Sequence, residues 1–259
     1  MTNGSTSTEI GEFQGLRQIP VDRWHRTDHG DFVADFYRPL LSNSIHYDRT
    51  SGYFDTASLQ LVMASLAQFT ENGERIRLVI SPRTRRRDLD ALLSRCVKPP
   101  MDLSEAFGSN NFIDVFVECM TCDRFAATRR LIERKALDVR IAYVDDSSPF
   151  SYYHEKLGIF SDQFGNRVAF TSSVNETGLG WNGHFESFDV YTSWRFADVI
   201  RFEQRRQALQ VIWTDNVDGL CVVPLEEARD QGIGINHVLI NGSFTQHHKS
   251  LRHLTNRFT

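Results

Sequence analysis

The sequence predicts an α/β domain in which a mixed β-sheet is flanked by helices on both faces. Two observations carry this prediction. Short apolar or alternating runs of strand length recur along the chain, and the segments between them repeat their apolar residues at helical spacing. Such a change of period is typical of strands that alternate with helices. No internal repeat is found.

The expected elements follow one another along the chain. Helices are expected at residues 31–41, 56–69 and 197–213, with a mostly helical stretch at residues 86–136. Strands are expected at residues 44–54 (a strand or extended turn), 76–81, 138–144, 153–160, 167–172, 186–194 and 220–223. In the first helix, Phe32, Phe36 and Leu40 share one face, which predicts that this face is buried.

The chain divides into a flexible N-terminal tail at residues 1–16, a globular domain at residues 17–235, and a basic C-terminal tail or docking segment at residues 236–259. The N-terminus shows no secretory signal, and no apolar stretch is long enough to cross a bilayer. Four cysteines fit a reducing compartment better than a disulfide scaffold. We therefore expect a cytoplasmic protein that does not contact a membrane.

The overall charge is slightly acidic, with a formal net charge of −4. This argues against a protein that coats nucleic acid by bulk charge, but not against an enzyme that concentrates positive charge in one groove. Basic clusters occur at residues 83–87, 129–135 and 201–206. Each of them alone is more often a solvated helix face than a phosphate-binding track.

Five polar residues that suit phosphoryl chemistry fall close together in the predicted domain: His154, Lys156, Ser173, Asn175 and Glu186. In a strand, residues two apart leave the same face, so the imidazole of His154 and the ammonium of Lys156 are expected side by side. An imidazole can attack or protonate, and lysine and asparagine can neutralise phosphate oxygens. A carboxylate can hold the imidazole in its working tautomer.

This pattern resembles the signature of the phospholipase D superfamily, which is H-x-K, then Asp, then G-S-x-N. His154 and Lys156 form the H-x-K, and T-S-S-V-N at residues 171–175 stands for the G-S-x-N. Glu186, eleven residues after Asn175, matches the acidic residue of the nuclease branch. The sequence departs from the pattern in two ways. Ser172 replaces the glycine, and the Asp comes one residue late, at Asp162, where the resemblance implies a structural role.

The resemblance extends over roughly residues 20–228, which look like the phospholipase-D-like nuclease domains of bacterial restriction and anti-phage defence systems. These domains are often fused to superfamily 2 helicases. The resemblance implies a phospholipase-D-like nuclease fold and a DNA endonuclease, with RNA as an alternative substrate. It also implies a helicase or ATPase partner, since this chain has no Walker A sequence.

Only one complete signature, an H-x-K followed by an S-x-N, is present, whereas the two-step reaction of the family needs two imidazoles. Members of the family with a single motif pair as dimers and build one site across the two-fold axis. The resemblance therefore implies a homodimer. In it, His154 of one subunit forms a phosphohistidine, and His154 of the other protonates the leaving oxygen and then activates water.

Substrate contacts are expected from two further segments. Arg49, Ser51 and Tyr53 lie in a stretch that the resemblance places near the rim of the active site, with Arg49 as a phosphate contact. Gly52 within this stretch suits a backbone that must approach closely or take a positive φ. On the loop after the S-x-N, Trp181 and Asn182 are expected either to face the substrate or to pack the loop.

No cofactor or metal is expected, because lysine and asparagine supply the positive electrostatics. Cys119 and Cys122 form a lone C-x-x-C without a second pair, which is more often two thiols on a helix than a zinc site. His247 and His248 lack a carboxylate or cysteine partner nearby in the sequence.

Two alternatives stay open. The first is a non-catalytic protein, a DNA-binding or dimerisation subunit of a helicase-containing defence complex. The second is a phosphodiesterase whose substrate is not nucleic acid, such as a phospholipid headgroup. The intact set of His154, Lys156, Asn175 and Glu186 argues against a catalytically silent module.

Overall fold

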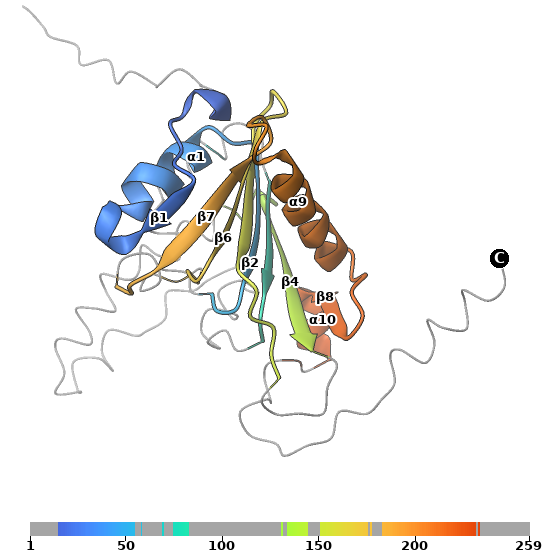
Figure 1. The fold of residues 1–259 in the computed structure, drawn as a ribbon. Coiled ribbons are helices and arrows are strands. Elements are labelled where there is room, and N and C mark those ends of the chain that lie inside the picture. The colour runs from blue at the N-terminus through green and yellow to red at the C-terminus, as the bar shows by residue number, and fades with distance from the viewer. Residues whose placement is uncertain are drawn as a thin grey trace, which may run out of the picture.

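The structure is a computed structural model that describes residues 15–54, 58, 69, 75–82, 131, 134–144, 151–175, 177, 183–231 and 233. Within these residues, eight strands form one mixed sheet (Figure 1). In their spatial order, they are β1 (Trp24–Arg26), β7 (Ser187–Thr192), β6 (Arg167–Ser172), β5 (Leu157–Ser161), β2 (His46–Ser51), β3 (Arg75–Ile80), β4 (Leu137–Val144) and β8 (Leu220–Pro224).

The directions of the strands determine which strand ends lie together. β2, β3 and β4 pair in parallel, whereas β5 pairs antiparallel with both β2 and β6, and β7 pairs antiparallel with both β6 and β1. The C-terminal ends of β2 and β6 therefore meet the N-terminal ends of β5 and β7 at one edge of the sheet. The predicted catalytic residues lie just beyond these ends.

One face of the sheet is covered by a short helical segment that follows β1. It consists of the π-helical η3 (Phe32–Tyr37) and α1 (Arg38–Ser42), and it begins where the Asp31 carboxylate accepts hydrogen bonds from two backbone N–H groups. Its Phe36 is buried among the aromatic rings of the sheet, with ring centroids 5.4 Å from Phe170 and 4.7 Å from Phe188.

The other face is covered by α9 (Val199–Trp213), whose Phe202 and Leu209 are buried with sheet residues such as Leu157. Figure 1 shows α1 and α9 on opposite sides of the sheet. At the C-terminal end of α9, the ring of Trp213 lies against the guanidinium groups of two sheet arginines, Arg77 and Arg140. The predicted α/β class, a mixed sheet with helices on both faces, is confirmed.

The strands predicted at residues 76–81, 138–144, 167–172 and 220–223 agree with β3, β4, β6 and β8 to within one residue. Several short elements were not predicted: η1 (Leu16–Gln18), β1, η2 (Thr27–His29) and α10 (Leu225–Asp230). Elements this short show no recognisable period in the sequence. The segments predicted at residues 56–69 and 86–136, and the C-terminal tail, lie almost entirely outside the described residues.

Leu16, at the end of the predicted N-terminal tail, is fully buried, and its backbone N–H donates to the Asp162 carboxylate at 2.8 Å. Asp162 also accepts from the backbone N–H groups of Phe164 and Asn166. It follows the last residue of β5 and so lies at the end of the sheet opposite the candidate site. These contacts stabilise the β5–β6 turn, as expected for a structural aspartate.

No helix in the described part of the chain is long and apolar enough to cross a membrane.

Candidate active site

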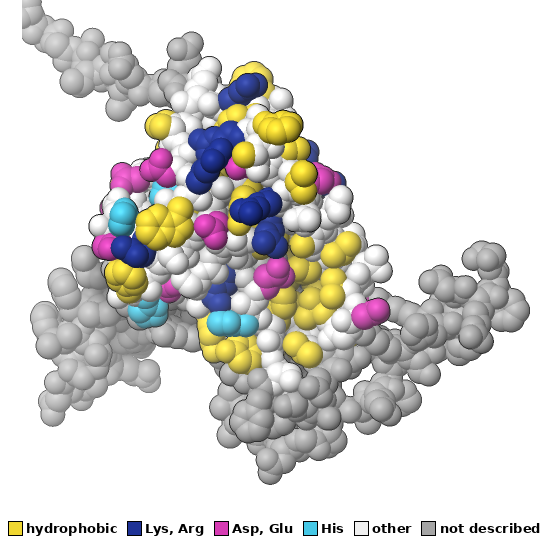
Figure 2. Space-filling model, viewed as in Figure 1, with side chains coloured by type: hydrophobic (Ala, Val, Ile, Leu, Met, Phe, Trp, Pro, Cys, Tyr) yellow, Lys and Arg dark blue, Asp and Glu magenta, His cyan; other side chains and the backbone are white. Residues whose placement is uncertain are grey.

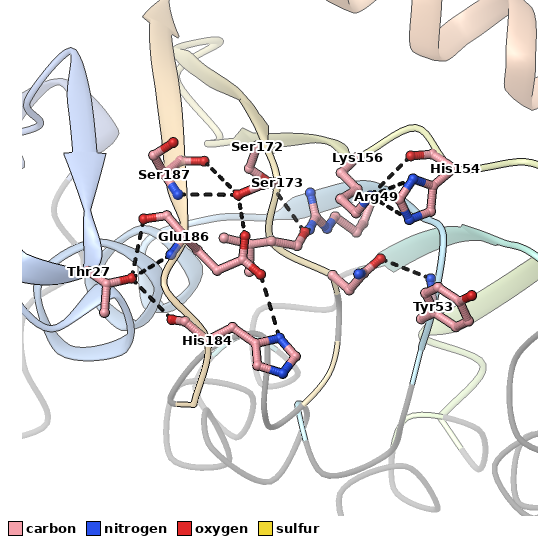
Figure 3. Close-up of polar contacts among 12 residues, drawn as sticks. Thr27, Arg49, Tyr53, His154, Lys156, Ser172, Ser173, His184, Glu186 and Ser187 are labelled. Atoms are coloured by element: carbon pink, nitrogen blue, oxygen red, sulfur yellow. Dashed lines mark hydrogen bonds and ion pairs between the residues drawn. The ribbon is translucent and has the colours of Figure 1, made fainter.

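His154 and Lys156 lie in an extended segment before β5, not inside a strand as predicted at residues 153–160. The Thr50 hydroxyl accepts the hydrogen bond of the Leu157 N–H at 2.9 Å, so a side chain takes the place of a backbone partner where β5 begins. The predicted juxtaposition still holds. The Lys156 ammonium lies 3.0 Å from Nε2 and 3.2 Å from Nδ1 of His154 (Figure 3).

The His154 ring is exposed on one side and confined on the other by close neighbours. A Cβ added to Gly52 would lie 2.3 Å from Cδ2 of the ring, so the glycine backbone forms one wall. Tyr152 and Tyr53 contact the ring edge to face, with centroids at 5.2 Å and 6.0 Å. The predicted close approach at Gly52 is therefore confirmed, and the partner is the imidazole.

Lys156 is buried, with only 9% of its surface exposed. Burial lowers the pKa of its ammonium, the positive charge of Arg49 lowers this pKa further, and the Glu186 carboxylate opposes the shift. An ammonium has only hydrogens to donate, so its contact with His154 favours an imidazole with a free lone pair. The site therefore combines an exposed imidazole with a buried cation.

Asn175 follows β6 and faces the turn after β2. Its Oδ1 accepts the hydrogen bond of the Tyr53 backbone N–H at 3.1 Å, so its NH₂ group is directed away from Tyr53. Tyr53 thus contributes a ring beside His154 and a backbone group that orients Asn175. The S-x-N loop and the Gly52 turn are joined by this contact.

Glu186 precedes β7 and is buried to the same extent as Lys156. Its carboxylate accepts a hydrogen bond from the Ser173 hydroxyl, and Nδ1 of His184 lies 3.7 Å from its other oxygen. Its backbone is held by Thr27, which accepts from the Glu186 N–H at 2.7 Å and donates its own N–H to the Glu186 carbonyl at 3.0 Å. That Glu186 orients the His154 imidazole stays a prediction.

Two of the predicted substrate contacts lie inside the molecule. Arg49 is fully buried, donates to the Val174 carbonyl at 2.6 Å and stacks over Phe170 with a separation of 4.9 Å. Ser51 is also fully buried, and its hydroxyl donates to the Tyr53 carbonyl. Trp181 and Asn182 lie outside the described residues.

The structure adds two residues that the sequence reasoning missed, Thr27 and His184. His184 lies two residues before Glu186, and a histidine this close to a predicted catalytic carboxylate was the available signal. Thr27 offered no signal, because it reaches Glu186 only through the pairing of β1 with β7.

Among the described residues, no three His, Cys, Asp or Glu side chains are grouped to hold a metal ion. Cys119, Cys122 and His247 lie outside them.

No protein-family model and no curated protein matches the chain. Solved structures that are similar to it include NucT from Helicobacter pylori, with 10% identity, a TM-score of 0.42, and coverage of 72% of this chain and 91% of that chain. Nuc from Salmonella typhimurium, a phospholipase D family member, has 12% identity, a TM-score of 0.39, and coverage of 74% and 92%. Phosphatidylserine synthase from Haemophilus influenzae has 14% identity, a TM-score of 0.42, and coverage of 91% and 44%. With similarities this low, the functional assignment depends on the geometry of the site.

Proposed function

We propose that the chain is a metal-independent phosphodiesterase, a DNA endonuclease that uses a phosphohistidine intermediate at a site shared across a homodimer. The observation that carries the proposal is the buried Lys156 ammonium in contact with the exposed His154 imidazole. A buried cation whose pKa is lowered by burial and by a neighbouring arginine gains stability when an anion binds. A phosphodiester is such an anion.

In the proposed first step, a ring nitrogen of His154 attacks phosphorus, and a P–N bond forms as the P–O bond to the leaving oxygen breaks. A second imidazole, His154 of the other subunit, gives its proton to the leaving oxygen. In the second step, this imidazole takes a proton from water, the water oxygen bonds to phosphorus, and the P–N bond breaks. Lys156 and the Asn175 amide neutralise the phosphate oxygens throughout.

The choice of DNA as the substrate, and of bacterial defence or restriction as the setting, is supported by the sequence resemblance described above. A helicase or ATPase partner belongs to the same proposal. RNA and phosphodiesters other than nucleic acid are the competing substrates, and they are distinguished by the experiment below.

The test is incubation of the wild type and of His154→Ala with single-stranded DNA, duplex DNA, RNA and bis(p-nitrophenyl) phosphate, all in EDTA. His46→Ala is the matched control, because His46 is also exposed but lies at the opposite end of β2. We expect cleavage by the wild type and the control, and none by His154→Ala, with the fold of all three confirmed by circular dichroism.

A trapped, acid-labile phosphoenzyme on the wild type would support the intermediate. Cleavage by His154→Ala at the wild-type rate, or activity of the wild type that disappears in EDTA, would contradict the mechanism. Hydrolysis of the small diester without cleavage of any nucleic acid would contradict the nuclease assignment.

A further inference from the structure

We propose that Trp24, Arg26 and Phe185 form a platform on which unpaired bases stack, so that the preferred substrate of the candidate site is single-stranded nucleic acid. We call these three residues the stacking platform. The inference rests on the proposed function and specifies its substrate class.

The three side chains form one layered group on the surface. The Arg26 guanidinium lies 5.0 Å from the centroid of the Trp24 ring and 5.7 Å from that of Phe185. Although they are large and apolar, Trp24 is 42% exposed and Phe185 is 70% exposed. Figure 2 shows hydrophobic, basic, acidic and histidine side chains together on the side of the molecule where β1 lies in Figure 1. Exposed rings interleaved with arginine are the surface on which single-stranded nucleic acid stacks.

The charge of the stacking platform favours bases over phosphates. The Asp28 carboxylate accepts two hydrogen bonds from Arg26, at 2.5 Å and 2.7 Å, so the guanidinium is held in place and its charge is balanced. A balanced guanidinium attracts phosphate weakly but still offers a planar surface for stacking. In a duplex the base faces are covered by neighbouring bases, whereas in a single strand they are free to stack on aromatic rings.

The stacking platform adjoins Glu186 of the candidate site, both along the chain and across the β1–β7 pairing. Phe185 directly precedes Glu186, and Arg26 pairs with Ser187 across the β1–β7 ladder. The next residue, Thr27, makes the hydrogen bonds that hold the Glu186 backbone. In Figure 3, Glu186 lies between Thr27 on one side and Lys156 with His154 on the other. A strand with its phosphate at His154 can therefore extend its bases toward β1.

The test measures binding separately from catalysis. In a His154→Ala background, fluorescence anisotropy gives the dissociation constant for a labelled single-stranded oligonucleotide and for a duplex of the same sequence. Trp24→Ala and Phe185→Ala are compared with Phe164→Ala, a matched control that removes a ring that is 64% exposed at the opposite end of the sheet.

We expect each platform variant to weaken single-strand binding about tenfold, because one stacked base is lost. Phe164→Ala should leave the affinity for the single strand unchanged, and none of the three substitutions should change the affinity for the duplex. An oligonucleotide with an abasic site at the stacked position should bind the wild type and the platform variants equally.

Equal losses for single strand and duplex, or no loss at all, would overturn the proposal. A platform variant that changes the self-association of the protein in sedimentation, but not its affinity for the oligonucleotide, would also overturn the proposal. The rings would then be assigned to contact with a second copy of the chain. If the wild type cleaves nothing but the stacking effects are found, the proposed catalysis fails while the stacking platform stands.

Discussion

The position of the His154 ring depends on a residue without a side chain. Gly52 allows the backbone after β2 to pass against the imidazole, and any Cβ there would overlap Cδ2 of the ring. Gly52 has no positive φ, so its role is the close approach alone. Because an attacking nitrogen must reach phosphorus in a narrow range of positions, a small displacement of the ring has a large effect on rate.

We therefore predict that Gly52→Ala lowers kcat about 100-fold, the loss typical of a displacement of about 1 Å at a reacting group. The added methyl group displaces the imidazole, and the other contacts of the domain stay in place. Steady-state cleavage kinetics measure the effect, and thermal unfolding shows whether the domain is still folded. Wild-type kcat in a folded variant would contradict the role assigned to Gly52.

Lys156 provides a second prediction, which concerns its titration. Burial and Arg49 lower its pKa from the ordinary value of 10.5, whereas Glu186 raises it. We expect Glu186→Gln to lower the pKa of Lys156 further, because the opposing negative charge is lost. Since the folded pKa lies below the unfolded value, Lys156 disfavours folding at low pH. This cost disappears as the pH rises from the folded pKa toward 10.5.

An NMR titration of the Lys156 side chain checks this prediction in the wild type and in Glu186→Gln, and it does not depend on catalysis. A pKa that is unchanged or higher in the variant would show that Glu186 does not act on Lys156 through its charge.

Arg49 connects two elements, β2 and the S-x-N loop after β6. Its guanidinium holds the Val174 carbonyl next to Asn175, and no part of its side chain is exposed. We infer that it positions the loop and adds positive charge near Lys156, in place of the direct phosphate contact expected from its place in the sequence. A lysine keeps the charge but lacks the planar group that both donates to the carbonyl and stacks on Phe170.

We predict that Arg49→Lys lowers kcat and leaves KM nearly unchanged, with a loss of about 1–3 kcal/mol in the free energy of unfolding. Arg140→Lys is the matched control, because Arg140 also donates to a backbone carbonyl, that of Trp213, and stacks on the ring of the same residue away from the site. The control should lose stability and keep its kcat. A raised KM with normal kcat in Arg49→Lys would indicate a phosphate contact after all.

The proposed dimer concerns the molecule as a unit, because one chain has a single complete signature of H-x-K followed by S-x-N. If the shared site requires both imidazoles, a dimer in which one subunit lacks His154 is inactive. In randomly assembled mixtures, activity should then fall with the square of the wild-type fraction.

We predict that mixtures with equal amounts of wild-type and His154→Ala chains, refolded together, retain about one quarter of the wild-type activity. Sedimentation establishes the oligomeric state, and His46→Ala mixed in the same way should retain full activity. Retention of about one half would mean that each chain works alone.

Local pattern was enough to predict much of this protein. Patterns among residues a few positions apart predicted three features. These are the succession of the main strands along the chain, the helix α9, and the proximity of His154 to Lys156. Residue spacing determines which side chains share a face of a strand or helix, and this relation does not depend on the rest of the chain. The start of β5 was predicted four residues too early, because the hydroxyl of Thr50, distant in sequence, ends the ladder there.

Contacts between distant segments were decided only by the tertiary structure. Arg49 reaches Val174 across 125 residues, and Thr27 reaches Glu186 across 159. The burial of Arg49 and the assembly of the stacking platform depend on which strands become neighbours in the sheet. That arrangement minimises the free energy of the whole chain, so no short segment specifies it. The proximity of the proposed catalytic pair, His154 and Lys156, could therefore be predicted from its spacing. The residues that support the pair and the surface beside it could be identified only from the folded sheet.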